Sequence, residues 1–269
     1  MSAQLISSAT AYPPSLELMP HEVLIEGRYK VRFANSEEEL DELLRLRFEI
    51  FNIELKEGLE ESFETGRDRD EFDVVCHHLI VIEQTTGEIV GTYRMQTSCM
   101  AGGGYGYYSA AEFDLGSLPS SVVDDAVEVG RACVALGHRN TQVLYLLWRG
   151  LALYMAGNQR RYLFGCCSLT SQDPDEGRAV MAYLERHNHL HPALNVIPQA
   201  GFECYDDSSA LDLSRYNPIK LPKLFRTYLR HGAKVCGPPA IDRRFKTIDY
   251  LVIFDVAAMD ERRYRTFFG

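Results

Sequence analysis

The strongest constraint in this sequence is a set of charged residues that lie inside or beside apolar runs. Arg47 falls on the apolar stripe of a predicted helix, where it lies either at a solvated edge or inward, held by a carboxylate. Arg94 and the segment Glu128-Val129-Gly130-Arg131 interrupt predicted strands, and Asp70 and Asp73 form a further acidic pair. A charge in a protein interior is costly unless it is paired or takes part in chemistry. Several such charges in one chain therefore predict one shared polar site.

Gly130 lies between two of these charges and predicts a local change in strand geometry. On an ideal strand Glu128 and Arg131 would point to opposite faces, because side chains alternate with a period of two. A glycine inside a strand often marks a bulge, which would bring both side chains near one face and splay the strand from its neighbour. Backbone N–H groups exposed at such a splay can hold an extended ligand or a thioester oxygen. The alternative interpretation is a structural Glu–Arg pair at a sheet end.

The order of the predicted elements indicates the fold class. Strands are expected at 29–33, 78–83, 89–95, 126–135, 162–168 and 248–256, and helices after Ser36 and at about 137–157, 179–187 and 221–231. This order predicts an α/β fold, a three-layer sandwich with one mixed, splayed central sheet flanked by helices. We expect residues 1–27 to form a flexible arm and residues 28–269 to form a single domain. Within it, residues 54–71 are expected to be mobile and exposed.

Charge and hydropathy narrow the range of partners. The formal net charge of −10 argues against nucleic-acid binding. Eight basic residues nevertheless gather between Lys220 and Lys246, opposed only by Asp242, and predict a local basic patch. No apolar run approaches the roughly 20 residues that span a membrane, and the first twenty residues lack the features of a secretory signal. We therefore expect a cytoplasmic location. The seven cysteines include no CxxC, which predicts buried thiols rather than a metal or disulfide framework.

Four motifs, in order along the chain, resemble the signature of the acyl-homoserine lactone (autoinducer) synthases. They are Arg47-Phe48-Glu49-Ile50-Phe51, Asp70-Glu71-Phe72-Asp73, Gly91-Thr92-Tyr93-Arg94 and Glu128-x-Gly130-Arg131. A closer likeness is to the ornithine N-acyltransferases of ornithine-lipid synthesis. It covers about residues 29–269 and rests on Phe72-Asp73-x-x-Cys76-x-His78-Leu79, Tyr107-Tyr108-Ser109-x-x-Glu112-Phe113, Leu146-Leu147-Trp148-x-Gly150, Phe164-Gly165-Cys166-x-Ser168, Tyr228-Leu229-Arg230-x-Gly232-Ala233, and Asp242, Phe245, Thr247 and Asp249.

This resemblance implies the N-acetyltransferase (GNAT) fold and a reaction between two substrates. A fatty acyl group would pass from an acyl carrier protein thioester to the α-amine of an amino acid, with ornithine the first expectation. An α-amine is mostly protonated at neutral pH, so a proton acceptor is needed, and Glu128 is the candidate. Arg131 would hold Glu128 or bind the acceptor's carboxylate in a fork. No tightly bound cofactor and no metal are expected.

The other charged residues have two possible roles under this resemblance. Arg47 and Arg94 would either lock the segment that carries Asp70 and Asp73 over the site or bind a substrate carboxylate. Asp70 and Asp73 could instead bind a substrate ammonium. The same residues would also serve an acyl-homoserine lactone synthase-like enzyme, or remain in a non-catalytic module of this fold that binds acyl groups or a protein partner.

The donor is predicted from two regions. Arg139-Asn140-Thr141 opens a helix without the second glycine of a coenzyme A pyrophosphate loop, but its backbone N–H groups could take the single phosphate of phosphopantetheine. Lys223, Arg226 and Arg230 lie in the basic run and could dock an acidic carrier protein. The alternatives for this run are a solvated face or attraction to anionic lipid at a membrane surface.

Three departures from the ornithine family leave the acceptor amine open. Before the basic helix, Leu221-Pro222-Lys223 stands where a second proline is usual. The strand that carries Phe164 is followed by Leu169-Thr170-Ser171-Gln172 where an apolar-Pro-Gly turn is usual. Cys236-Gly237-Pro238-Pro239 replaces a Gly-Asp-Gly turn after the basic helix. Related synthases acylate other amino acids, so these changes affect the expected acceptor more than the expected fold.

Overall fold

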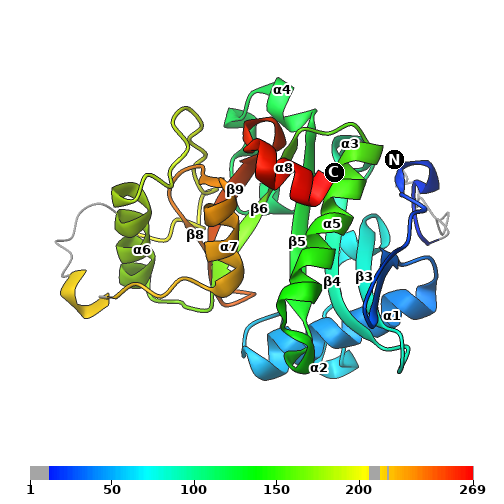
Figure 1. The fold of residues 1–269 in the computed structure, drawn as a ribbon. Coiled ribbons are helices and arrows are strands. Elements are labelled where there is room, and N and C mark those ends of the chain that lie inside the picture. Colours follow the sequence, from blue (N-terminus) through cyan, green and yellow to red (C-terminus); the bar gives the residue numbers. More distant parts are fainter. Residues whose placement is uncertain (1–11, 206–212, 217, 269) are drawn as a thin grey trace, which may run out of the picture.

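One mixed sheet of nine strands organises the computed structural model, which describes residues 12–205, 213–216 and 218–268 (Figure 1). The strand order is β1-β2-β3-β4-β5-β6-β9-β7, with β8 also paired to β9. Strands β5 and β6 run parallel, and the other pairs are antiparallel. The strands are β1 (Leu24–Glu26), β2 (Tyr29–Phe33), β3 (His77–Glu83), β4 (Ile89–Thr97), β5 (Ala126–Val134), β6 (Tyr162–Leu169), β7 (Lys234–Val235), β8 (Ala240–Asp242) and β9 (Thr247–Asp255).

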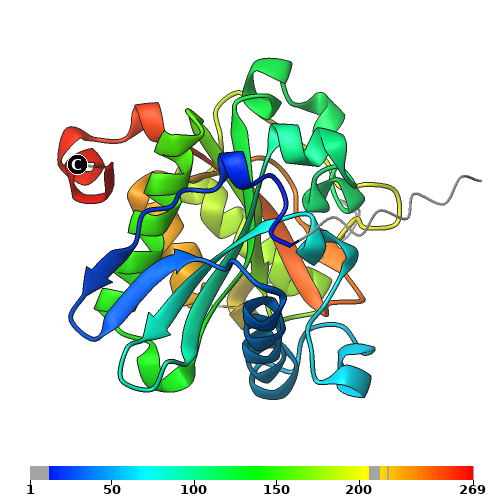
Figure 2. The same ribbon diagram turned by 90° about the vertical axis from the view of Figure 1, so that its right-hand side faces the viewer.

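Helices cover both faces of this sheet, which confirms the predicted GNAT-like sandwich (Figure 2). Helices α5, α6 and α7 pack on one face, and α1 with the segment from α3 to α4 packs on the other. Ser36 caps α1 by accepting a hydrogen bond from the Glu39 N–H, as its sequence predicts. The helices are α1 (Glu37–Phe48), α2 (Ser62–Thr65), α3 (Ser98–Gly103), α4 (Ser120–Val123), α5 (Thr141–Gly157), α6 (Pro174–Arg186), α7 (Lys223–His231) and α8 (Glu261–Phe268).

Alternation along the central strands gives the two faces different chemistry. The face toward α5 and α7 carries apolar side chains, among them Tyr93, Met95, Val129, Val252 and Phe254, all in one core. The side chains between them point to the other face and are mostly polar around the middle of the sheet: Arg94, Gln96, Glu128, Cys166, Ser168 and Asp249. The sheet therefore separates an apolar layer from a polar one.

The predicted bulge and splay are both present in β5. Thr92 pairs with Cys133 and Arg94 pairs with Gly130, so β5 has one extra residue in this interval. Arg131 takes the left-handed conformation at φ 51°, whereas Gly130 does not have a positive φ. After the pair Glu128–Phe164, β5 and β6 no longer pair with each other. The glycine that sterics require is Gly165, because a Cβ there would lie 2.1 Å from the Val129 carbonyl oxygen.

Two expectations about the N-terminal part of the chain need correction. Residues 1–11 lie outside the described residues, but the rest of the predicted 1–27 arm packs on the domain: β1 pairs with β2, and the Pro14 carbonyl lies 2.7 Å from His77 Nε2. The charged segment 54–71 is not simply exposed, because Glu57 and Asp68 are buried in it. Both errors have one cause, since a short polar segment that is held by tertiary contacts has the same composition as a free one.

Candidate active site

Three arginines and three aspartates form one buried ion-pair network. Its members are Arg47, Arg94, Arg131, Asp68, Asp70 and Asp73. Arg47 has no exposed surface and points inward, where its Nε lies 2.6 Å from Asp68 and its Nη1 lies 2.6 Å from Asp73. Arg94 Nη1 donates to Asp70 at 2.5 Å and to Asp73 at 2.9 Å. Equal numbers of opposite charges allow this network to lie in the interior.

The network holds the segment before β3 against the sheet. Asp70 and Asp73 also cap each other's backbone in the 3₁₀ turn Glu71–Val74. Burial alone would raise the pKa of Asp73, but Arg47 and then Arg94 hold it well below its usual range. His78 lies beneath, with its Nε2 3.0 Å from the Asp73 carbonyl oxygen, and burial lowers the pKa of its imidazole to about 4. Asp73 is therefore ionised and His78 neutral at physiological pH.

Glu128 anchors the loop that follows α3. Its carboxylate accepts four hydrogen bonds at 2.6–2.8 Å, from the N–H groups of Tyr108 and Ser109, the Ser109 hydroxyl and the Gln96 amide. A carboxylate offers about four lone-pair positions, so these donors use all of them. Of the two roles predicted for Arg131, holding Glu128 is not observed. The bulge directs Arg131 to Asp70, at 3.2 Å, and to the Tyr108 hydroxyl, also at 3.2 Å.

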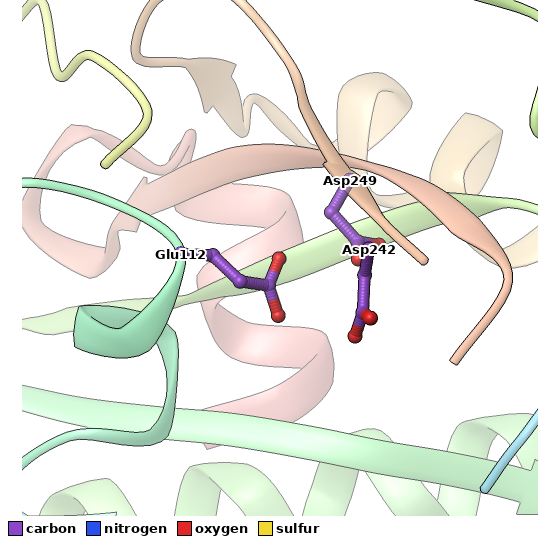
Figure 3. A group of neighbouring side chains, drawn as sticks. All are labelled: Glu112, Asp242 and Asp249. Atoms are coloured by element: carbon purple, nitrogen blue, oxygen red, sulfur yellow. The ribbon is translucent and has the colours of Figure 1, made fainter. Parts of the chain in front are cut away.

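A second group of buried carboxylates forms no ion pair with any residue that the structure describes. Glu112 ends the 3₁₀ turn Tyr108–Ala111, Asp242 ends β8 and Asp249 lies on β9, and one oxygen from each lies within 4.8 Å of the others (Figure 3). Burial, and then the charges of Asp249 and Asp242, raise the pKa of Glu112 well above its usual range. Burial also raises the pKa of Asp249, against a hydrogen bond from Thr247. We refer to these three residues as the acidic cluster.

Glu57 is a fourth buried carboxyl group near the acidic cluster. Its Oε2 accepts a hydrogen bond of 2.7 Å from the Thr170 hydroxyl. Burial raises the pKa of Glu57 to about 7, the Thr170 hydrogen bond opposes this rise and the charge of Asp249 adds to it. A carboxyl group with this pKa can exchange a proton at neutral pH, which is the property of an effective general base.

A cavity of about 310 Å³ passes through the splay between β5 and β6. On one side it is lined by apolar groups of the sheet and of α7, including Met95, Val252, Phe254, Phe225 and Tyr228. On the other side it is lined largely by polar groups, including Glu57, Glu112, Glu128, Arg131, Asp242 and Asp249. One cavity thus joins a surface suited to a hydrocarbon chain with a surface suited to a charged substrate.

A second cavity, of about 330 Å³, meets the first at four residues: Tyr108, Glu112, Arg131 and Asp242 line both. Its remaining lining includes Arg69, Arg243 and Arg244. Arg131 lies between the rings of Tyr108 and Phe245, with its guanidinium carbon 4.7 Å and 4.3 Å from their centroids. Two substrates that enter by different cavities would meet at these shared residues.

The residues predicted to bind the donor lie apart from the buried networks. Arg139 precedes α5 and forms a bidentate pair with Glu54, at 2.6 and 2.7 Å, and Asn140 caps the helix by accepting from the Val143 N–H. Thr141 is exposed. On α7, Lys223, Arg226 and Arg230 are exposed and make no ion pair within the described residues, while the opposite side of the helix lines the first cavity.

Sequence reasoning missed two residues of this site and left others without a role. Asp68 and Glu57 lie in the segment expected to be exposed, and nothing in their local pattern distinguishes them from solvated carboxylates. Glu112, Asp242 and Asp249 were identified only as part of a family likeness, and their proximity depends on the pairing of β8 with β9. Among the described residues, no helix combines the length and apolar character that crossing a membrane requires.

Comparison with known proteins agrees with this architecture. Residues 46–149 match the model of the acetyltransferase (GNAT) domain family. The chain is 30% identical over 257 residues to an L-ornithine N(alpha)-acyltransferase of Agrobacterium fabrum, with 90% of this chain and 86% of the relative covered. It is 32% identical over 255 residues to one of Rhodobacter capsulatus, with coverage of 89% and 94%.

A solved structure supports the fold independently of these relatives. The AHL synthase LasI superposes with a TM-score of 0.50 at 12% identity, covering 91% of this chain and 96% of that one. At this identity the likeness shows the fold alone. Together with the sequence relatives, it establishes that the chain is an acyltransferase with the GNAT fold and belongs to the family of the L-ornithine N(alpha)-acyltransferases.

Proposed function

We propose that this protein transfers a long-chain fatty acyl group, with or without a 3-hydroxyl, from acyl carrier protein to the α-amine of ornithine. The observation that carries the proposal is the cavity through the β5–β6 splay, which is apolar on one side of the sheet and polar on the other. The names of the sequence relatives supply the expected acceptor. The product would be amphiphilic, so we expect a cytoplasmic enzyme with peripheral contact to the inner membrane surface.

The donor would enter from the side of α5 and α7. An acidic carrier protein would dock on Lys223, Arg226 and Arg230, since these exposed cations have no ionic partners within the described residues. The phosphate of its phosphopantetheine arm would bind the N-terminal backbone of α5, with Asn140 and Thr141 beside it. Arg139 would contribute by exchanging its bond to Glu54 for the phosphate. The acyl chain would then occupy the apolar side of the cavity.

The acceptor would enter by the second cavity and reach the thioester at the shared residues. Arg131 is the proposed ligand of its carboxylate, because the Arg131 Nη1 group makes no hydrogen bond within the described part of the chain. Arg47, Arg94, Asp70 and Asp73 are proposed to hold Arg131 in place. Their charges satisfy one another, which leaves them little capacity to bind a substrate.

The reaction requires the α-ammonium to lose one proton before its nitrogen attacks the thioester carbonyl carbon. We assign this proton to Glu57, whose pKa of about 7 allows it to be ionised and yet basic at neutral pH. Glu128, the earlier candidate, has both oxygens occupied by four donors and is assigned the positioning of the Tyr108–Ser109 loop. The tetrahedral intermediate collapses with rupture of the C–S bond. The departing pantetheine thiolate takes the second N–H proton from the former amine nitrogen, the amide remains, and Glu57 releases the first proton to solvent.

The proposal is tested by mass spectrometry of reactions that contain the purified protein. Donors are long-chain and 3-hydroxyacyl carrier protein and the matching acyl coenzyme A, and acceptors are ornithine, a pool of other amino acids and S-adenosylmethionine. An N-acyl ornithine formed from the carrier-protein donor is the expected result. A homoserine lactone product would mean that the acceptor is S-adenosylmethionine and not ornithine. Absence of any product, with carrier protein still bound, would favour a non-catalytic binding module.

A further inference from the structure

We propose that the acidic cluster of Glu112, Asp242 and Asp249 binds the side-chain ammonium of the acceptor. It would thereby make the enzyme selective for amino acids with a second, positively charged amine. This inference rests on the proposed function, because it takes the acceptor to be acylated on its α-amine, and it adds a specificity site distinct from the residues that handle that amine.

The cluster has unused hydrogen-bonding capacity in a buried place. Glu112 is 3% exposed and Asp249 is 4% exposed, and Oε2 of the first and Oδ1 of the second accept no hydrogen bond from the described residues. Figure 3 shows that the three side chains come from separate segments and turn toward a common space. Buried carboxylate oxygens without partners are costly. Without a ligand, a proton on Glu112 that is shared with Asp249 relieves this cost, as the raised pKa of Glu112 indicates, and a cationic ligand would take the place of that proton.

No cation among the described residues forms an ion pair with this cluster. Arg47, Arg94 and Arg131 are matched by Asp68, Asp70 and Asp73 in the ion-pair network. In the second cavity, Arg243 donates to the Gly201 carbonyl and Arg244 pairs with Glu61. Asp242 uses Oδ1 to accept from the N–H groups of Arg244 and Phe245, so its role in the hairpin leaves the second oxygen for another partner. An alkylammonium has three N–H donors, one for each carboxylate of the acidic cluster.

The acidic cluster and Arg131 lie at the same junction of the two cavities and can serve as two anchors for one amino acid. Glu112 and Asp242 line both cavities together with Arg131, the proposed ligand of the acceptor carboxylate. An acceptor held by its carboxylate at Arg131 and by its side-chain ammonium at the cluster has its α-carbon between them, at the junction of the cavities. A divalent metal ion is the competing occupant, since Mg²⁺ can bind through one or two carboxylates and complete its octahedron with water. The EDTA arm of the test distinguishes it from an ammonium.

The test compares ornithine with norvaline, which has the same carbon skeleton but no side-chain amine, in the wild type, Glu112→Gln and Asp249→Asn. Both α-N-acylation and direct binding by calorimetry are measured, in buffer with EDTA. We expect kcat/KM of the wild type for ornithine to exceed that for norvaline by at least about 100-fold, since the cluster is left unpaired by norvaline. Each variant should lose most of this ratio while its rate with norvaline is kept or raised. Asp255→Asn, on the same strand but paired with Arg161 at the surface, is the matched control and should keep the ratio.

The outcomes separate the inference from the proposed function. Equal use of norvaline and ornithine by the wild type would overturn the inference and leave the acyltransferase reaction intact. Ornithine binding that is strong in the wild type and lost in both variants would support the site even if no product formed, in which case only the proposed reaction would fail. Activity that EDTA abolishes and Mg²⁺ or Ca²⁺ restores, with no preference for ornithine, would assign the acidic cluster to a metal ion instead.

Discussion

Two groups of buried charges lie side by side in this molecule, and they differ in balance. In the ion-pair network each aspartate contacts at least one arginine, and Arg47 is completely buried without an unpaired charge. In the acidic cluster three carboxylates converge, and none of them forms an ion pair with a residue in the described part of the chain. The first arrangement is balanced in charge and holds the chain and Arg131 in position. The second is incomplete, and it is the incomplete group that we associate with a ligand.

The two groups should respond to pH in opposite directions. The folded-state pKa of Asp73 is depressed, so its contribution to stability is present above the unfolded pKa of about 3.9 and is lost as the pH falls. The pKa values of Glu112 and Asp249 are raised, so their contribution is present below about pH 4 and is lost as the pH rises. A stability profile thus reports on both groups separately.

Loss of Arg47 would have the largest effect on the balanced group. Arg47→Met leaves Asp68 and Asp73 buried without their main partner, and removal of one member of a buried ion pair costs about 3–5 kcal/mol. Urea denaturation measures this loss. Arg45→Met is the control on the same helix, because its pair with Asp41 is more than half exposed and should contribute less than about 1 kcal/mol. A similar, small loss in both variants would mean that the network does not stabilise the fold.

Substitution of Glu57 should affect catalysis more than folding. In the wild type, kcat/KM should rise with pH to a plateau above about pH 7 as Glu57 ionises. Glu57→Gln should lower kcat by about 10²–10⁴-fold and remove this rise, whereas Glu64→Gln, an exposed neighbour in sequence, should change neither. If Glu128→Gln rather than Glu57→Gln removed the pH dependence, the proton acceptor would be Glu128.

The splay that joins the apolar and polar layers depends on a glycine in β6. A Cβ in Gly165→Ala would lie 2.1 Å from the Val129 carbonyl oxygen, so the strands must shift, at a cost of about 1–3 kcal/mol, and the cavity should deform. Thermal unfolding and donor KM both measure this change. Gly130→Ala is the matched control in β5, where an added Cβ has no atom within 4 Å. A larger loss of stability in Gly130→Ala than in Gly165→Ala would mean that the backbone contact that requires glycine lies in β5.

Charge reversal on α7 should produce the smallest effect. Lys223→Glu combined with Arg226→Glu should raise the KM for acyl carrier protein about tenfold at low salt and leave kcat nearly unchanged, because surface charges act mainly on encounter. The KM for acyl coenzyme A should not change by a similar factor. Arg186→Glu at the end of α6 is the control for a general change of surface charge. An unchanged KM for the carrier protein would place its docking site elsewhere.

The sequence predicted the scaffold well because its signals are local. Alternating and helical periodicities identified β2 to β6, β9, α1, α5 and α7, and the glycine inside β5 indicated a bulge that the register of β4 and β5 confirms. The charged residues within apolar runs do converge, since Arg47, Arg94 and Arg131 share three aspartates. A charged residue within an apolar run must be paired or take part in chemistry, so such residues can be recognised from the sequence alone.

The acidic cluster and Glu57 could not be predicted in this way. Asp242 and Asp249 lie at the two sides of a hairpin whose register decides their proximity, and Glu112 reaches them from a different part of the chain. Glu57 and Asp68 belong to a polar segment that is buried only by tertiary contacts. Of the two roles predicted for Arg131, holding Glu128 is not observed, because a bulge permits the two side chains to approach one face without requiring that they contact each other. Binding of the acceptor carboxylate stays a proposal.

The most direct test of the contrast between complete and incomplete charge groups is the unfolding free energy of the wild type and Glu112→Gln between pH 5 and 8, with and without ornithine. Without ornithine, the stability of the wild type should fall as the pH rises, and Glu112→Gln should be more stable and show a smaller fall. Ornithine should stabilise the wild type most at the higher pH and the variant little. A variant that is less stable than the wild type at every pH, and equally stabilised by ornithine, would contradict the account.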